Sequence, residues 1–214
     1  MVPKPGPSSK SAYPYTPGRQ ERLKRLQQDR RQAGAPQWRM AANTVNSPPV
    51  SQGERWKPSV TVAAIIEHDG SYLLVEENTA EGLKLNNPAG HLDPGESPLQ
   101  GVVRETLEET ARHFEAQAVL GIYLSRFRRQ RSGEDVTFLR IAFCGTVGAA
   151  DPTLALDVPI VRTLWMTPAE VRASVARHRS PLLLRCIEDH LAGKRYSLDL
   201  LHADASLWQP ELRP

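Results

Sequence analysis

Three glutamates with the spacing of one helical face are the residues best placed to do chemistry in this sequence. Glu105, Glu108 and Glu109 stand at positions i, i+3 and i+4, so a helix would bring their carboxylates to one side. Like charges at these spacings repel, and a divalent cation would turn that repulsion into binding free energy. Because the ligand set is all oxygen, it favours Mg²⁺ or Mn²⁺ over Zn²⁺. A solvated helical face is the alternative interpretation of a bare glutamate cluster.

The element that carries these glutamates is predicted to be a helix over Ser97–Ala111. Three start signals agree: Ser97 as N-cap, Pro98 at the first helical position and Gln100 two residues later, where it can close a capping box. Gly101 lies on the glutamate face and is expected to leave room for a bulky ligand. The opposite face, expected to pack on a sheet, consists of Leu99, Val102, Val103, Thr106 and Leu107.

The residues before the helix complete a longer motif. Gly90, five residues, Glu96, seven residues and then Arg104-Glu105, two residues and Glu108-Glu109 resemble the Nudix box at each of its invariant polar and glycine positions. The resemblance implies a loop–helix–loop that holds divalent ions against a diphosphate.

That resemblance also implies roles for the motif residues. The metal ligands would be the carbonyl oxygen of Gly90 and the carboxylates of Glu105, Glu108 and Glu109. The catalytic residues would be Glu96, Arg104 and Glu108, with Arg104 orienting a box glutamate and Glu96 acting as the acid at the helix entrance. An ordinary salt bridge remains the alternative for Arg104 and Glu108, which are also an i, i+4 pair.

This chain departs from the box in two ways. The motif usually closes with Gly and an apolar residue, where this chain has Ala111 and Arg112, and Thr106 replaces a small apolar residue. Since Ala resists the left-handed conformation that Gly permits, we expect the helix to end nearer Arg112–His113. Neither departure removes a metal ligand.

Bound metal ions would lower the pKa of a water molecule and stabilise the leaving phosphate. A carboxylate must accept the proton of that water. The choice stays open between a box glutamate and the acidic residues Glu134, Asp135, Asp151 and Asp157.

Strand and helix signals surround the motif. A strand is expected at Ser59–Glu67, with a Gly-bearing turn into Tyr72–Glu76, and a polar loop is expected over Asn78–Lys84. Further strands are expected at Leu85–Ala89, Ala116–Phe127 and Val136–Val147, with helices starting at Thr167-Pro168 and Ser180-Pro181 and a stop at Gly193. Together they predict the α/β (α+β) fold class, as an α/β/α sandwich on a mixed sheet.

Charge and proline content divide the chain into three parts. Met1–Pro58 carries eleven Lys and Arg, three acids and nine of the eighteen prolines, which leaves a net charge of −5 on the remainder. We therefore expect a disordered basic tail over residues 1–57, a catalytic domain over 58–203 and a C-terminal tail over 204–214. Within the first tail, only Arg19–Ala33 could be helical. A start at Met40 is an alternative.

Flanking segments point to one branch of the family. Trp56–Glu77, Asn86–Ser97, Thr137–Phe143 and Arg179–Leu201 resemble the bacterial NudJ-type phosphatases. That resemblance implies a small-molecule pyrophosphate substrate, such as thiamine or hydroxymethylpyrimidine pyrophosphate or a nucleoside di- or triphosphate. Aromatic residues able to stack on a pyrimidine are few, and most are expected in the core: Tyr123, Phe127, Phe138, Phe143 and Trp165.

Two other function classes stay open. A 5′-RNA or dinucleotide pyrophosphohydrolase would keep the motif and use the basic tail to hold a polymer. A non-catalytic Nudix-like sensor would bind a ligand without hydrolysing it, but the presence of every box acid disfavours it. The sequence has neither a run of eighteen apolar residues nor a secretory signal, and Cys144 and Cys186 match no metal or disulfide spacing. We therefore expect a cytoplasmic monomer or homodimer, with no membrane partner and with nucleic acid disfavoured.

Overall fold

A computed structural model describes residues 56–128 and 133–209. The expected disordered tail, its candidate helix Arg19–Ala33 and the alternative start at Met40 lie outside the described residues, except for the last two residues of that tail. Among the helices of the described ranges, none is long and apolar enough to cross a lipid bilayer.

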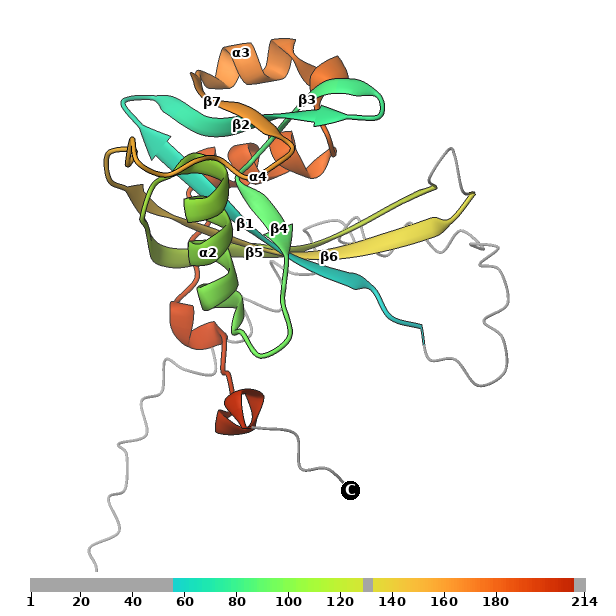
Figure 1. Cartoon of the computed structure of the whole chain (residues 1–214), viewed down its shortest axis with the longest axis vertical. Helices are drawn as coiled ribbons and strands as arrows, with labels where there is room; N and C mark the ends of the chain where they lie inside the picture. The colour runs from blue at the N-terminus through green and yellow to red at the C-terminus, as the bar shows by residue number, and fades with distance from the viewer. Residues whose placement is uncertain (1–55, 129–132, 210–214) are drawn as a thin grey trace, which may run out of the picture. The chain divides into compact units, whose positions relative to one another are not determined.

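Seven strands form one mixed sheet (Figure 1). They are β1 (Ser59–His68), β2 (Ser71–Thr79), β3 (Gly82–Asn86), β4 (Ala89–His91), β5 (Phe114–Arg128), β6 (Asp135–Val147) and β7 (Ile160–Met166). The main order is β3-β2-β1-β6-β5, with β4 paired to β1 and β7 paired to β2. Among the strand pairs of the described residues, only β1–β6 is parallel. Strand β1 spans both halves of the sheet because β4 and β2 pair with successive parts of it.

Helices cover both faces of the sheet. They are α2 (Pro98–Thr110), α3 (Pro168–Ala173) and α4 (Leu182–Leu191), with 3-10 helices η2 (Val175–Arg177), η3 (Leu198–Leu200) and η4 (Ala205–Trp208). Side chains of β1 alternate between two cores: Val62 and Ala64 pack in the cluster that contains Val102 of α2, whereas Ala63 packs in the cluster that contains Leu183 of α4. Figure 1 shows α2 and α4 on opposite sides of β1, which confirms the predicted α/β/α sandwich.

The predicted helix starts are present. Ser97 caps α2 in a complete capping box with Gln100, and Thr167 caps α3 in the same way with Glu170. Gly193, just beyond α4, has φ of 77°, the left-handed conformation expected of a helix stop. These ends were predictable because each depends on residues within one turn of the helix.

The structure differs from the sequence-based expectations in the following places. The expected loop over Asn78–Lys84 is a hairpin in which β2 and β3 pair up to Thr79 and Gly82. Strand β7 was not predicted from the sequence. It pairs with β2, which lies far from it along the chain. Finally, α2 ends at Thr110, because Ala111 adopts φ of 53° and ψ of 32° itself. This conformation costs an Ala about 1 kcal/mol.

His190 of α4 provides a test of how stability depends on pH. Its Nδ1 lies 2.7 Å from the hydroxyl of Tyr72, and burial, aided by Arg195, lowers the pKa of His190 to about 4 despite the opposing effect of Glu67. In the unfolded chain, His190 would therefore become protonated below about pH 6.5. In the folded chain it becomes protonated only near pH 4. This contribution to stability is complete above pH 6.5 and is lost as the pH falls.

We expect His190→Gln to reduce the loss of unfolding free energy between pH 7 and pH 4.5 by roughly 1–2 kcal/mol. Gln can still accept the hydrogen bond from Tyr72, so the change removes titration more than packing. Urea unfolding at a series of pH values measures the difference between the wild type and the variant. Parallel pH profiles would contradict the role assigned to His190.

Candidate active site

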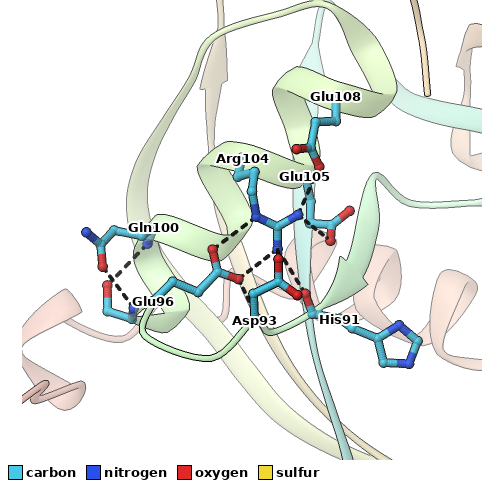
Figure 2. Close-up of polar contacts among 8 residues, drawn as sticks. His91, Asp93, Glu96, Gln100, Arg104, Glu105 and Glu108 are labelled. Carbon is cyan, nitrogen blue, oxygen red and sulfur yellow. Dashed lines mark hydrogen bonds and ion pairs between the residues drawn. The ribbon is translucent and has the colours of Figure 1, made fainter. Parts of the chain in front are cut away.

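Arg104 lies at the centre of the candidate site (Figure 2). Its Nε and Nη2 donate to the two oxygens of Glu96 at 3.0 and 2.7 Å, a bidentate pair. Its Nη1 donates to Glu105 Oε1 and to Glu108 Oε2, both at 2.9 Å, and its Nη2 also donates to the carbonyl of His91 at 3.0 Å. One guanidinium thus gathers three carboxylates from the helix and from the loop before it.

Both carboxylate oxygens of Glu96 accept hydrogen bonds within this cluster. Besides the pair with Arg104, Oε1 accepts a hydrogen bond from the backbone N–H of Asp93 at 2.7 Å. The hydrogen bonds from Arg104 hold the pKa of Glu96 below its usual value. The carboxylate of Asp93 also lies 3.6 Å from Arg104. Glu96 therefore fixes Arg104 and the loop, and Figure 2 shows its side chain turned toward Arg104.

Gly90 allows Glu105 to approach the backbone of β4. A Cβ at position 90 would lie 2.1 Å from the carboxyl carbon and from both carboxyl oxygens of Glu105, so no other residue fits without moving that carboxylate. The space beside Gly101 is used differently from what we expected. A Cβ there would lie 2.9 Å from Glu96 Oε1 and 3.1 Å from Leu92, so this position accommodates side chains of the loop rather than a ligand.

Glu109 lies on the same side of α2 as Glu105 and contacts β4 as well. Its Oε2 accepts a hydrogen bond from the backbone N–H of Ala89 at 2.8 Å. Burial raises the pKa of Glu109 to about 8, with a smaller contribution from Glu105, and burial likewise raises the pKa of Glu105. Burial therefore favours the protonated form of both carboxyl groups, and a cation bound beside them would favour their charged form.

These carboxylates suit a hard divalent cation. Gly90, Glu105 and Glu109 meet at β4, and Glu108 joins Glu105 through their shared donor, the Nη1 of Arg104. Every donor atom in this set is oxygen, as Mg²⁺ and Mn²⁺ prefer. Across residues 56–128 and 133–209, no three His, Cys, Asp or Glu side chains converge as a metal-binding group.

The chain matches the family model described as the NUDIX domain over residues 55–186. It belongs to the Nudix family. The chain is also 30% identical over 146 residues to the phosphatase NudJ of Escherichia coli K12, covering 68% of this chain and 92% of that protein. The resemblance seen in the box is thus confirmed, and the protein is a Nudix hydrolase that acts on phosphorus anhydrides.

Solved structures agree with this assignment. A NUDIX hydrolase from Nitrosomonas europaea is 50% identical, with a TM-score of 0.64, over 69% of this chain and 98% of that one. A second NUDIX hydrolase from the same organism is 19% identical, with a TM-score of 0.52, over 67% of this chain and 78% of that one, and supports the fold alone.

Of the four acids considered as general base outside the box, two lie beside α2. Asp157 donates its backbone N–H to the carbonyl of Glu108 at 3.0 Å, and Asp151 donates its own to the carbonyl of Ala111 at 2.7 Å. The carboxylate of Asp151 accepts hydrogen bonds from Thr153. Asp135 instead pairs with Arg126 at 2.8 Å on the ribbon of β5 and β6, next to Glu134.

Sequence reasoning missed two buried charged residues near the box. Glu77 is 8% exposed and Arg140 is 7% exposed, and both interact electrostatically with Glu109. Burial raises the pKa of Glu77 and lowers the pKa of Arg140. A signal was present in both cases, because a charged residue interrupts an apolar strand in TFLRIAF and two acids close the apolar run of β2.

Proposed function

We propose that the protein hydrolyses a diphosphate bond in small nucleoside or pyrimidine pyrophosphates, including thiamine pyrophosphate and nucleoside di- and triphosphates. Water attacks phosphorus, and Mg²⁺ or Mn²⁺ is required. The observation that supports this proposal best is the cluster around Arg104, where Glu96, Glu105 and Glu108 share one guanidinium beside Gly90.

In this proposal the ligands are the carbonyl of Gly90 and the carboxylates of Glu105, Glu108 and Glu109. When bound, the ions would supply charge neutralisation for the phosphate oxygens and a water of lowered pKa. Arg104 holds Glu105 and Glu108 by one oxygen each, so the other oxygen of each carboxylate could face an ion.

Glu96 and Glu108 complete the proposed roles. Glu96 keeps Arg104 in place and so acts as a positioning residue. The side chain of Glu108 is 37% exposed, more than those of Glu96 and Glu105, so it has the freedom to accept the proton of a water molecule. Asp157, joined to α2 through the carbonyl of Glu108, is the alternative base.

Small substrates are favoured over RNA by charge. Outside the basic N-terminal segment the chain carries −5, so beyond its metal ions the domain offers a phosphodiester polymer little long-range attraction. The similarity to NudJ over 146 residues supports the same choice. The eleven basic residues of the first 58 positions are the feature that favours the alternative, a 5′-RNA pyrophosphohydrolase. We propose a cytoplasmic location and a monomer or homodimer, since both cysteines are buried free thiols.

A competition between thiamine pyrophosphate and a 5′-triphosphorylated oligonucleotide tests this choice. We expect faster phosphate release from thiamine pyrophosphate at physiological salt, with the full chain and with a variant lacking Met1–Arg39. If the basic segment recruits RNA, activity on the oligonucleotide should fall steeply with salt and disappear on truncation. Faster hydrolysis of the oligonucleotide by the truncated protein would favour the RNA alternative.

A further inference from the structure

Arg140 is a buried cation without an ion-pair partner. It lies in the middle of β6 and is 7% exposed, and its Nε and Nη1 have no hydrogen-bond partner among the described residues. Within those residues it forms no ion pair with a carboxylate, although Glu109 and Glu77 act on it electrostatically, and its neighbour on α4 is the thiol of Cys186. Burying a guanidinium in this way is costly for folding, which indicates that a ligand completes its hydrogen bonds.

Further buried oxygen atoms without partners lie on β1 and at the ends of β2 and β3. Thr61 faces Arg140 across the β1–β6 pair, and its Oγ1 accepts or donates no hydrogen bond in the described residues. Glu77 at the end of β2 has an unpartnered Oε1, while its Oε2 lies 3.5 Å from Arg179. The Oδ1 atoms of Asn86, the last residue of β3, and of Asn87, the next residue, are unpartnered as well.

This group of polar atoms adjoins the Nudix box. Glu109 acts electrostatically on both Glu77 and Arg140, and it hydrogen-bonds Ala89, which pairs with Ala63 two residues after Thr61. We call the surface formed by Thr61, Glu77 and Arg140 the floor. A molecule whose diphosphate lies at the box carboxylates would therefore extend its remaining part along this floor.

Aromatic rings border the same floor. Phe138 lies two residues before Arg140 on β6, so both side chains project from the same face of the sheet. The ring of Phe138 lies 5.9 Å from that of His91 and stacks on Phe127 at 5.5 Å with an interplanar angle of 8°. Phe127 is 49% exposed, so these rings are not enclosed in a core. A flat ring could lie against Phe138 with its polar edge toward Arg140.

The unpartnered donors and acceptors indicate which kind of ligand could bind here. Arg140 offers two donor nitrogens, whereas the hydroxyl, carboxylate and amide groups offer mainly acceptors. A planar nitrogen heterocycle with a carbonyl or ring-nitrogen acceptor next to an amine donor satisfies both sets.

We propose that Arg140, with Thr61 and Glu77, recognises such a heterocycle, carried by the substrate beyond its diphosphate, and that Phe138 contacts its ring. This inference rests on the proposed function, because it assumes that the phosphates lie at the box. Arg140 is then the residue that distinguishes heterocyclic diphosphates from simple ones.

The test measures binding to the metal-free full-length protein by calorimetry. The probes are cytidine 5′-monophosphate, thiamine monophosphate and ribose 5-phosphate, of which the last has the sugar and the phosphate but no ring base. We expect Arg140→Met to weaken the binding of at least one heterocyclic probe tenfold or more and to leave ribose 5-phosphate unchanged. Arg126→Met is the matched control, since Arg126 points to the other face of the ribbon and pairs with Asp135.

Thr61→Val provides a second variant of nearly the same shape, in case Arg140→Met fails to fold. Replacing an unpartnered buried hydroxyl with a methyl group should raise the melting temperature and still weaken the same probe severalfold. Equal binding of both heterocyclic probes by the wild type and these variants would overturn the inference. So would a parallel loss of ribose 5-phosphate, which would assign the floor to the sugar. If instead the wild type hydrolyses no diphosphate with Mg²⁺ while binding still depends on Arg140, only the proposed function fails.

Discussion

Glu109→Gln is expected to lower kcat on a diphosphate substrate by about three powers of ten or more while leaving the fold intact. The backbone N–H of Ala89 can still donate to the amide oxygen of Gln, so the contact between α2 and β4 survives. What is lost is the negative charge that a divalent cation needs at this partly buried position. Glu108→Gln should behave similarly, because it removes the charge of another carboxylate in the proposed ligand set.

Two measurements separate loss of metal from loss of structure. Mg²⁺ should raise the melting temperature of the wild type but have little effect on Glu109→Gln, since only a protein that binds the ion is stabilised by it. Glu115→Gln, an exposed acid on β5, serves as the control and should match the wild type in both assays. Near-wild-type rates for Glu108→Gln and Glu109→Gln in saturating Mg²⁺ would refute the metal-ligand assignment.

The centre of the site was predictable from sequence because its geometry is local. Arg104, Glu105 and Glu108 lie within one helical turn or so, and the helix that aligns them begins at a capping box of Ser97 and Gln100. Helical periodicity alone places such residues on one face. The partner of Arg104 in the loop, Glu96, followed from the family motif rather than from periodicity.

The end of the same helix was not predictable, because it is set by a distant contact. Ala111 donates its backbone N–H to the carbonyl of Leu107 at 2.8 Å, and its own carbonyl accepts from Asp151, forty residues later, at 2.7 Å. The tertiary hydrogen bond helps hold Ala111 in the left-handed conformation, which local propensity disfavours. Intrinsic preference gave the wrong end point because it contains no information about Asp151.

The floor beside the box escaped sequence reasoning for a similar reason. Arg140 and Thr61 face each other only because β1 and β6 pair in parallel across nearly eighty residues. Periodicity identifies Thr137–Phe143 as a strand, but it does not give the register that brings Arg140 near Glu77 and Glu109. The unexpected Arg in an apolar strand was the available signal, and its meaning depended on the pairing.

Gly90→Ala is expected to lower kcat/KM by about a hundredfold or more, although it adds only one methyl group. The new Cβ would lie 2.1 Å from the carboxylate of Glu105, which must rotate away from β4. Because a side-chain end can move more easily than backbone, the melting temperature should change little while the ligand is displaced. Gly148→Ala is the matched control, since a Cβ there meets no atom within 4 Å.

A double-mutant cycle shows whether the methyl group acts through Glu105. If displacement of that carboxylate is the whole effect, Gly90→Ala should cost little more in a protein that already carries Glu105→Ala. Additive losses would mean that Gly90 acts independently, for example through its carbonyl as a metal ligand. Full activity of Gly90→Ala alone would show that the carboxylate of Glu105 functions equally well away from β4. In that case the close approach of Glu105 to Gly90 would have no role in catalysis.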